Sequence, residues 1–234
     1  MIHSLPSGYT ALVIGAGGGI GSALMDTLAD MPGCARVLGL GRASDPPVDL
    51  LDEGSLAAAA ARLSAACPDI RLILDATGAL AIDGTDPEKS LSALDPGVMA
   101  RSYAINAIGP ALLLKHLAPL LPRKGKSAFA TLSARVGSIA DNRLGGWYSY
   151  RAAKAALNQM VRSAAIEIAR SHPEAVCLAL HPGTVDTPLT RRYARGRFTH
   201  SPARCARNLL AVIDTATPAQ SGRFLAYDGQ RIPW

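Results

Sequence analysis

The chain has 234 residues, of which 49% are hydrophobic, 18% charged and 5% aromatic, with a formal net charge of +6. This composition excludes a disordered chain, and the basic balance without aromatic stacking motifs argues against a nucleic-acid partner. The sequence lacks an apolar run of roughly 18 residues, a secretory signal and a CxxC cysteine pair, so we expect a cytoplasmic protein with neither membrane contact nor metal site.

Strands and helices alternate along the chain. Apolar runs that end at glycines or turn residues predict strands, and longer segments with helical spacing predict helices. The predicted strands cover 10–14, 36–42, 71–78, 127–133, 175–183 and 223–227, and the predicted helices cover 19–31, 55–66, 96–121, 147–170 and 201–216.

This alternation predicts an α/β fold, a Rossmann-type doubly wound parallel sheet of about six strands with helices on both faces. We find no repeat, linker or change of composition, and expect residues 1–234 to form a single domain. Residues 48–50 follow the second strand too closely for a parallel crossover, which takes roughly a dozen residues. We therefore expect at most a short edge fragment there.

A glycine-rich turn follows the first predicted strand and opens the first helix, with the sequence GAGGGIG from Gly15 to Gly21. Glycines allow the backbone to approach a pyrophosphate, and the helix N-terminus supplies free N–H groups. At the end of the second strand, where NAD-binding folds usually place an acidic residue, stands Arg42. A guanidinium suits the 2′-phosphate of NADP, so the sequence favours NADP(H) over NAD(H).

The stretch WYSYRAAK, residues 147–154, contains two tyrosines and one lysine. Tyr150 and Lys154 stand at i and i+4 on one helical face, whereas Tyr148 has Ala152 at that position. A nearby ammonium favours the phenolate and lowers the pKa of a tyrosine. The pair therefore predicts a tyrosine that exchanges a proton with a carbonyl oxygen during hydride transfer.

Six motifs in order resemble the short-chain dehydrogenase/reductases over nearly the whole chain. They are GAGGGIG (15–21), DATG (75–78), NAIG (106–109), LSARVGS (132–138), YSYRAAK (148–154) and HPGTVDT (181–187). Residues 133–158 and the ending 221–234 most resemble the C-factor-like branch, and carbonyl reductases are close relatives of it.

The resemblance implies that Tyr150 is the general acid/base, that Lys154 lowers its pKa and binds the nicotinamide ribose, and that Asn106 holds a water in a proton relay. It further implies three groups of cofactor contacts. Gly15, Gly19, Ile20 and Gly21 would form the phosphate turn. Asp49, Leu50, Ala76 and Gly78 would lie along the adenosine, and Pro182, Gly183, Val185 and Thr187 would surround the nicotinamide carboxamide.

Two departures from the family pattern affect the expected site. The chain has Asp75-Ala76-Thr77-Gly78 where Asn-Asn-Ala-Gly is common, and Ala134 where a serine usually stands. A regular strand would turn the preceding Ser133 to the opposite side. We expect Ser133 to bind the substrate oxygen, with Ser138 and no serine at all as the alternatives.

The predicted function is that of an NADP(H)-dependent oxidoreductase that acts on a small carbonyl or secondary alcohol. The alternative is a dinucleotide-binding signalling protein with weak or no catalysis. Residues 188–201 are rich in arginine and glycine and predict a mobile lid, either a solvated loop or one that covers an anionic ligand. The resemblance also implies a homodimer or homotetramer.

Overall fold

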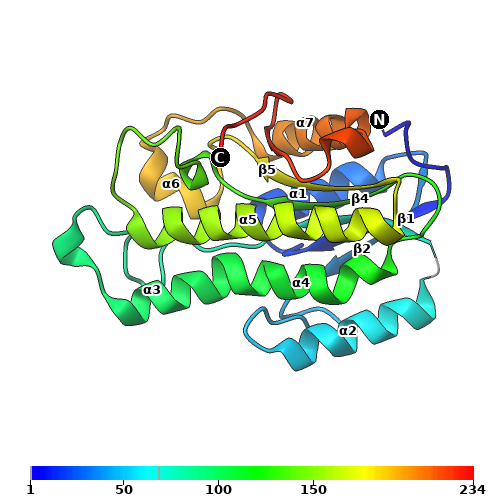
Figure 1. Ribbon diagram of the computed structural model, residues 1–234, viewed down its shortest axis with the longest axis horizontal. Coiled ribbons are helices and arrows are strands. Elements are labelled where there is room, and N and C mark those ends of the chain that lie inside the picture. The colour runs from blue at the N-terminus through cyan, green and yellow to red at the C-terminus, as the bar shows by residue number, and fades with distance from the viewer. Residues whose placement is uncertain (1, 68) are drawn as a thin grey trace.

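In the computed structural model, which describes residues 2–67 and 69–234, a six-stranded parallel sheet has the order β2-β1-β3-β4-β5-β6 (Figure 1). The strands are β1 (Tyr9–Ile14), β2 (Cys34–Leu40), β3 (Ile70–Asp75), β4 (Ser127–Leu132), β5 (Ala175–His181) and β6 (Phe224–Ala226). Since β1 pairs with β2 on one side and β3 on the other, the strand order reverses at β1. The predicted fold class is confirmed.

Helices cover both faces of the sheet (Figure 1). The helices α2 (Glu53–Ala66), α3 (Pro96–Tyr103), α4 (Gly109–Leu117) and α5 (Tyr148–Ser171) lie on one face, and α1 (Gly19–Ala29) and α7 (Pro202–Thr215) on the other. Alternating strand side chains fill two cores: Leu12 packs with the α2, α4 and α5 residues, and Val13 packs with those of α1 and α7. This alternation is the period of two that a strand imposes.

The segment between β2 and α2 contains no further strand. The Val48 N–H donates to the Gly41 carbonyl over 2.9 Å, and this bond folds the intervening residues back against the end of β2. The expectation of no additional parallel strand at residues 48–50 is confirmed.

The single helix predicted over 96–121 is interrupted in its middle. A π-helical turn, Ala104–Ile108, joins α3 to α4, and Asn106 lies at the centre of that turn. Isolated π turns within α-helices often occur at functional sites. The buried Asn106 side chain therefore marks this part of the fold for closer inspection.

Of the helices in the described part of the chain, none is long and apolar enough to span a membrane. In residues 2–67 and 69–234 we also find no group of three or more His, Cys, Asp or Glu side chains suited to a metal ion.

Candidate functional site

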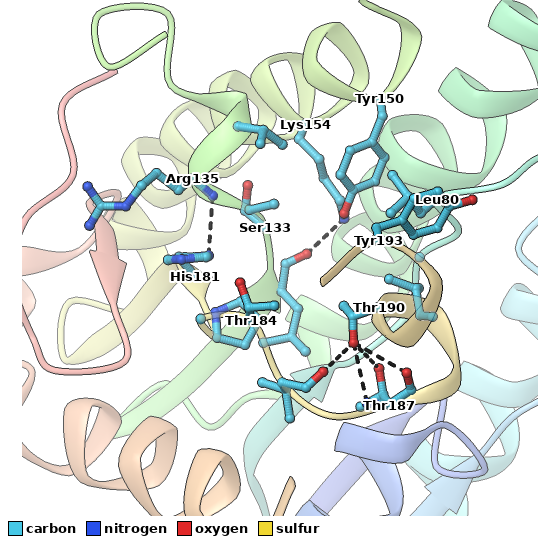
Figure 2. Close-up of a pocket in the computed structure, with 18 of the residues that line it drawn as sticks. Leu80, Ser133, Arg135, Tyr150, Lys154, His181, Thr184, Thr187, Thr190 and Tyr193 are labelled. Carbon is cyan, nitrogen blue, oxygen red and sulfur yellow. Dashed lines mark hydrogen bonds between the residues drawn. The ribbon is translucent and has the colours of Figure 1, made fainter. Parts of the chain in front are cut away.

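A cavity of about 830 Å³ opens at the carboxyl ends of the central strands (Figure 2). Its walls come from the glycine turn after β1, the segments that follow β3, β4 and β5, the start of α5 and the short helix α6 (Pro188–Ala194). The cavity lies at the point where the strand order reverses, the usual ligand site of open α/β sheets.

Gly15 and Gly21 allow the glycine turn to take its shape. Gly15 has φ +78°, and a Cβ on Gly21 would lie 2.1 Å from the Gly15 carbonyl oxygen. Gly17, Gly18, Gly19 and Ile20 line the cavity, whereas Gly15 and Gly21 do not. No side chain caps the N-terminus of α1, so its first N–H groups are available to an anion.

Tyr150 and Lys154 both project from the first turns of α5 into the cavity (Figure 2). The Lys154 ammonium donates a 2.9 Å hydrogen bond to the Leu132 carbonyl and lies 6.0 Å from the centre of the Tyr150 ring. The structure thus brings together the two side chains that the helical spacing selected.

Burial shifts the pKa values of both side chains. Loss of solvent raises the pKa of Tyr150 to about 12. It also lowers the pKa of Lys154 to about 8, against the opposing charge of Asp75. The sequence argument predicted a lowered pKa for the tyrosine, and burial moves it in the opposite direction. Tyr150 is protonated at neutral pH.

Asn106 lies behind the cavity, anchored to the segment that follows β3. Its Oδ1 accepts from the Ala79 N–H over 3.0 Å, and its Nδ2 donates to the Ala79 carbonyl over 2.8 Å. A Cβ on Gly78 would lie 3.2 Å from Asn106 Oδ1 and 3.4 Å from Lys154 Nζ. Gly78 has φ +150°, a conformation that favours glycine, and the amide and the ammonium approach it from two helices.

The carboxylate of the DATG segment (residues 75–78) is fully buried and hydrogen-bonded. Asp75 is 1% exposed, and its carboxylate accepts hydrogen bonds from the Thr77 N–H and hydroxyl and from the Thr131 hydroxyl. Ala76 and Gly78 line the cavity, as predicted for residues that pass beside a ligand.

The two candidate serines take different positions. Ser133 borders the cavity, and its hydroxyl donates a 2.6 Å hydrogen bond to Oδ1 of Asn158 on α5. Ser138 is 1% exposed, does not line the cavity, and donates to the Pro233 carbonyl over 2.5 Å. Ser133 is therefore the only one of the two that lies at the cavity, while Ala134 leaves an apolar wall beside it.

The segment after β5 closes one side of the cavity, and the predicted residues Pro182, Gly183, Val185 and Thr187 all line it. Thr187 also lies against the glycine turn, since a Cβ on Gly19 would come within 2.7 Å of its methyl carbon. His181 precedes this segment, and its Nδ1 accepts from the Arg135 N–H over 3.2 Å. Burial, reinforced by Arg135, lowers the pKa of His181 to about 4.

Besides Gly15, Gly21 and Asn106, three more predicted cofactor residues lie outside the cavity lining. Arg42 is exposed at the end of β2, and within the described residues it forms no ion pair. Asp49 follows the segment that folds back to β2, where its Oδ1 accepts from the Leu51 N–H. Leu50 packs against Gly109 of α4, where a Cβ would meet it at 2.7 Å. Their cofactor contacts stay predictions.

Two acidic residues of the loop between β3 and α3 were not recognised from the sequence. Glu88 is 6% exposed, and its carboxylate accepts hydrogen bonds from the Ser149 N–H and hydroxyl at the first turn of α5. Asp86 accepts from the Tyr193 hydroxyl over 2.7 Å and pairs with Arg192 at 2.8 Å. These carboxylates hold the helix that carries Tyr150 and the helix that covers the cavity, and no local sequence pattern reveals such contacts.

Comparison with known proteins agrees with this geometry. The sequence model of a family described as enoyl-(acyl carrier protein) reductase matches residues 29–232. The chain is 32% identical to 1-hydroxy-2-glutathionyl-2-methyl-3-butene dehydrogenase of Rhodococcus sp., over 96% of this chain and 99% of that protein. The chain belongs to the short-chain dehydrogenase/reductase family. It is therefore an oxidoreductase in class.

Two further relatives agree with the family that the motifs indicated. The C-signal protein of Myxococcus xanthus is 39% identical over 147 residues, which cover 62% of this chain and 84% of that protein. A short-chain dehydrogenase/reductase from Burkholderia multivorans, solved with bound NADP, superimposes with a TM-score of 0.80 at 26% identity, over 97% of this chain and 99% of that one.

Proposed function

We propose that this chain transfers hydride between NADP(H) and a carbonyl or secondary alcohol, with Tyr150 as the general acid/base. The observation that carries the proposal is the shared cavity: Tyr150 and Lys154 face the same enclosed space as the glycine turn and the segment from Pro182 to Thr187. A cofactor seated on that turn and a small substrate beside Tyr150 would both fit there.

The chain's own residues fit a dinucleotide phosphate. Within the described residues no side chain caps the N-terminus of α1, so the N–H groups of its first turn can bind a pyrophosphate, and the space beside Gly17 is open. Arg42 would bind the 2′-phosphate, with Asp49 and Leu50 beside the adenine. The relative from Burkholderia multivorans that was solved with NADP supports this choice of cofactor.

NADPH, when bound, supplies the hydride. Tyr150 donates the proton to the substrate oxygen, and its pKa of about 12 keeps that proton available at neutral pH. Burial therefore suits Tyr150 to donate a proton in carbonyl reduction, whereas oxidation of an alcohol would need the phenolate that burial disfavours. Lys154 would bind the nicotinamide ribose, and Asn106 would hold the water that passes protons towards it.

Ser133 is the proposed partner for the substrate oxygen. Because its hydroxyl proton is directed to Asn158, donation to the substrate needs the hydroxyl to rotate when the substrate binds. The cost of leaving the Asn158 oxygen without a partner makes Ser133 a weaker donor than Tyr150. Ser133→Ala should therefore lower kcat less than Tyr150→Phe does.

The decisive test is NADPH oxidation across a panel of aldehydes and ketones. Tyr150→Phe should lower kcat by about two to four orders of magnitude while NADPH binding stays unchanged. Arg42→Gln should weaken NADPH binding about tenfold and leave NADH binding unaffected, because only NADPH carries the 2′-phosphate. Full activity of the Tyr150→Phe variant would contradict the proposed mechanism.

A signalling role is the second candidate, and the likeness to the C-signal protein is the observation that favours it. Ala134 and the hydroxyl of Ser133 held by Asn158 are consistent with weak catalysis. Tight NADPH binding without turnover of any carbonyl in the panel would favour this role over the reductase.

We also propose that the chain forms a homodimer or homotetramer through α5. Met160 and Ile166 of this helix are 47% and 49% exposed, and burial of such side chains stabilises association. Sedimentation or light scattering of the purified protein tests this directly.

A further inference from the structure

The wall of the cavity has a strong excess of positive charge. Five cationic side chains line it, and among the described residues that do so a single carboxylate, Asp141, opposes them. The cations are Arg135, Arg143, Arg151, Lys154 and Arg197. Lys154 belongs to the proposed reaction, so the four arginines need a separate explanation.

Two of these arginines are occupied by the protein itself. Arg135 pairs with Asp141 at 3.0 Å. Arg151 donates to the carbonyls of Gly145, Gly146 and Val136, which fixes the loop before α5. These contacts neutralise the charge of Arg135 and hold the Arg151 side chain against its own loop.

Arg143 and Arg197 are different. Arg143 donates only to the carbonyls of Ala140 and Asn142 in its own loop, through Nη1. The Arg197 guanidinium has neither an ion pair nor a hydrogen bond to any other residue in 2–67 or 69–234. Within the described chain, both arginines therefore line the cavity without an acidic partner.

Both arginines belong to segments that enclose the end of the cavity near Tyr150. Arg143 lies four residues before Trp147, whose ring is edge-on to Tyr150 at 6.3 Å and to Tyr193 at 5.6 Å. Tyr193 lies in the last turn of α6, which ends at Ala194, and Arg197 follows three residues after that end. Arg42, the residue proposed for the cofactor phosphate, lies outside this wall.

Apolar side chains line the same cavity as these arginines. They include Leu80, Trp147 and Leu144, and Leu144 is 92% exposed although it is a leucine. A neutral, fully polar substrate would not use such a wall. A substrate with an apolar body and an anionic end would use both features.

We propose that the substrate carries a carboxylate or another anionic group several bonds from its reacting carbonyl, and that Arg143 and Arg197 bind this anion. The inference deepens the proposed function and rests on it, since the carbonyl is taken to lie at Tyr150. Arg143 and Arg197 would then set the specificity, whereas Tyr150 performs the chemistry.

The test compares 4-carboxybenzaldehyde with its methyl ester, two aldehydes of similar shape of which only the first is anionic at neutral pH. Binding of each to the protein with NADP⁺, which cannot reduce an aldehyde, gives Kd by calorimetry without turnover. NADPH oxidation gives kcat and KM for the same pair. The variants are Arg143→Gln, Arg197→Gln and the double variant.

Arg195→Gln is the matched control. Arg195 is exposed on the same lid and does not line the cavity, so its substitution removes one positive charge without touching the proposed site. It reports any effect of overall charge alone.

We expect the parent protein to bind the acid about tenfold more tightly than the ester, and each single variant to reduce that preference about threefold. The double variant should abolish the preference, Arg195→Gln should retain it, and higher salt should weaken it. Equal binding of acid and ester by the parent, or a preference that survives in the double variant, overturns the inference.

The two proposals fail separately in this experiment. A preference for the acid in binding, lost in the double variant, with no oxidation of NADPH by any carbonyl, supports the anion site and contradicts the reductase. Turnover of both aldehydes with equal kcat/KM supports the reductase and contradicts the anion site.

Discussion

His181 makes the stability of this protein sensitive to mild acid, and His181→Asn should remove that sensitivity. The imidazole sits at the end of β5, where its Nδ1 accepts the Arg135 N–H. Burial and the Arg135 charge oppose a second proton, so the pKa of His181 falls to about 4 in the folded protein. In the unfolded chain the same group titrates near its usual pKa of about 6.5.

The sign follows from proton binding. Between pH 6.5 and 4 the unfolded chain binds a proton at His181 that the folded protein does not, so acid favours unfolding. The stabilisation is complete above about pH 6.5 and is lost as the pH falls towards 4. With the folded pKa of about 4, the loss from this group is about 0.8 kcal/mol at pH 6 and about 2 kcal/mol at pH 5.

Asparagine suits the test because its Oδ1 can accept the Arg135 N–H and has no charge to gain. Urea unfolding from pH 7 to 5 gives the free energy of unfolding of parent and variant at each pH. The variant will have a lower free energy of unfolding at every pH because its side chain is smaller. The difference in free energy of unfolding between parent and variant should shrink by about 2 kcal/mol from pH 7 to pH 5. A difference that stays constant between pH 7 and 5 would show that His181 does not carry the effect.

Three further substitutions test residues that hold the walls of the cavity in place. Gly21→Ala places a Cβ 2.1 Å from the Gly15 carbonyl oxygen, so NADPH binding should fall at least about a hundredfold, as measured by fluorescence titration. Asp86→Asn removes the charge that holds helix α6 and should speed tryptic cleavage of the 188–201 segment severalfold, whereas Asp83→Asn in the same loop should not. Glu88→Gln removes a buried carboxylate from the N-terminus of α5 and should lower the free energy of unfolding by about 1–2 kcal/mol in urea titrations.

Local patterns in the sequence determined the architecture. Strand and helix periodicities, the glycine turn and the short connection after β2 predicted the six-stranded sheet, because each depends on neighbours within a few residues of the chain. The spacing of Tyr150 and Lys154 likewise placed both on one side of α5 and in one cavity, since helix geometry fixes where i and i+4 point.

Tertiary structure alone decided the electrostatics and the shape of the site. Burial reversed the expected direction of the Tyr150 pKa, because desolvation depends on everything packed around a group and not on its partner in the helix. Glu88 reaches α5 across 61 residues of sequence, and Arg143 and Arg197 line one cavity from separate loops. Such arrangements form only when distant segments fold together, so a single sequence indicates the candidate reacting residues but not the groups around them.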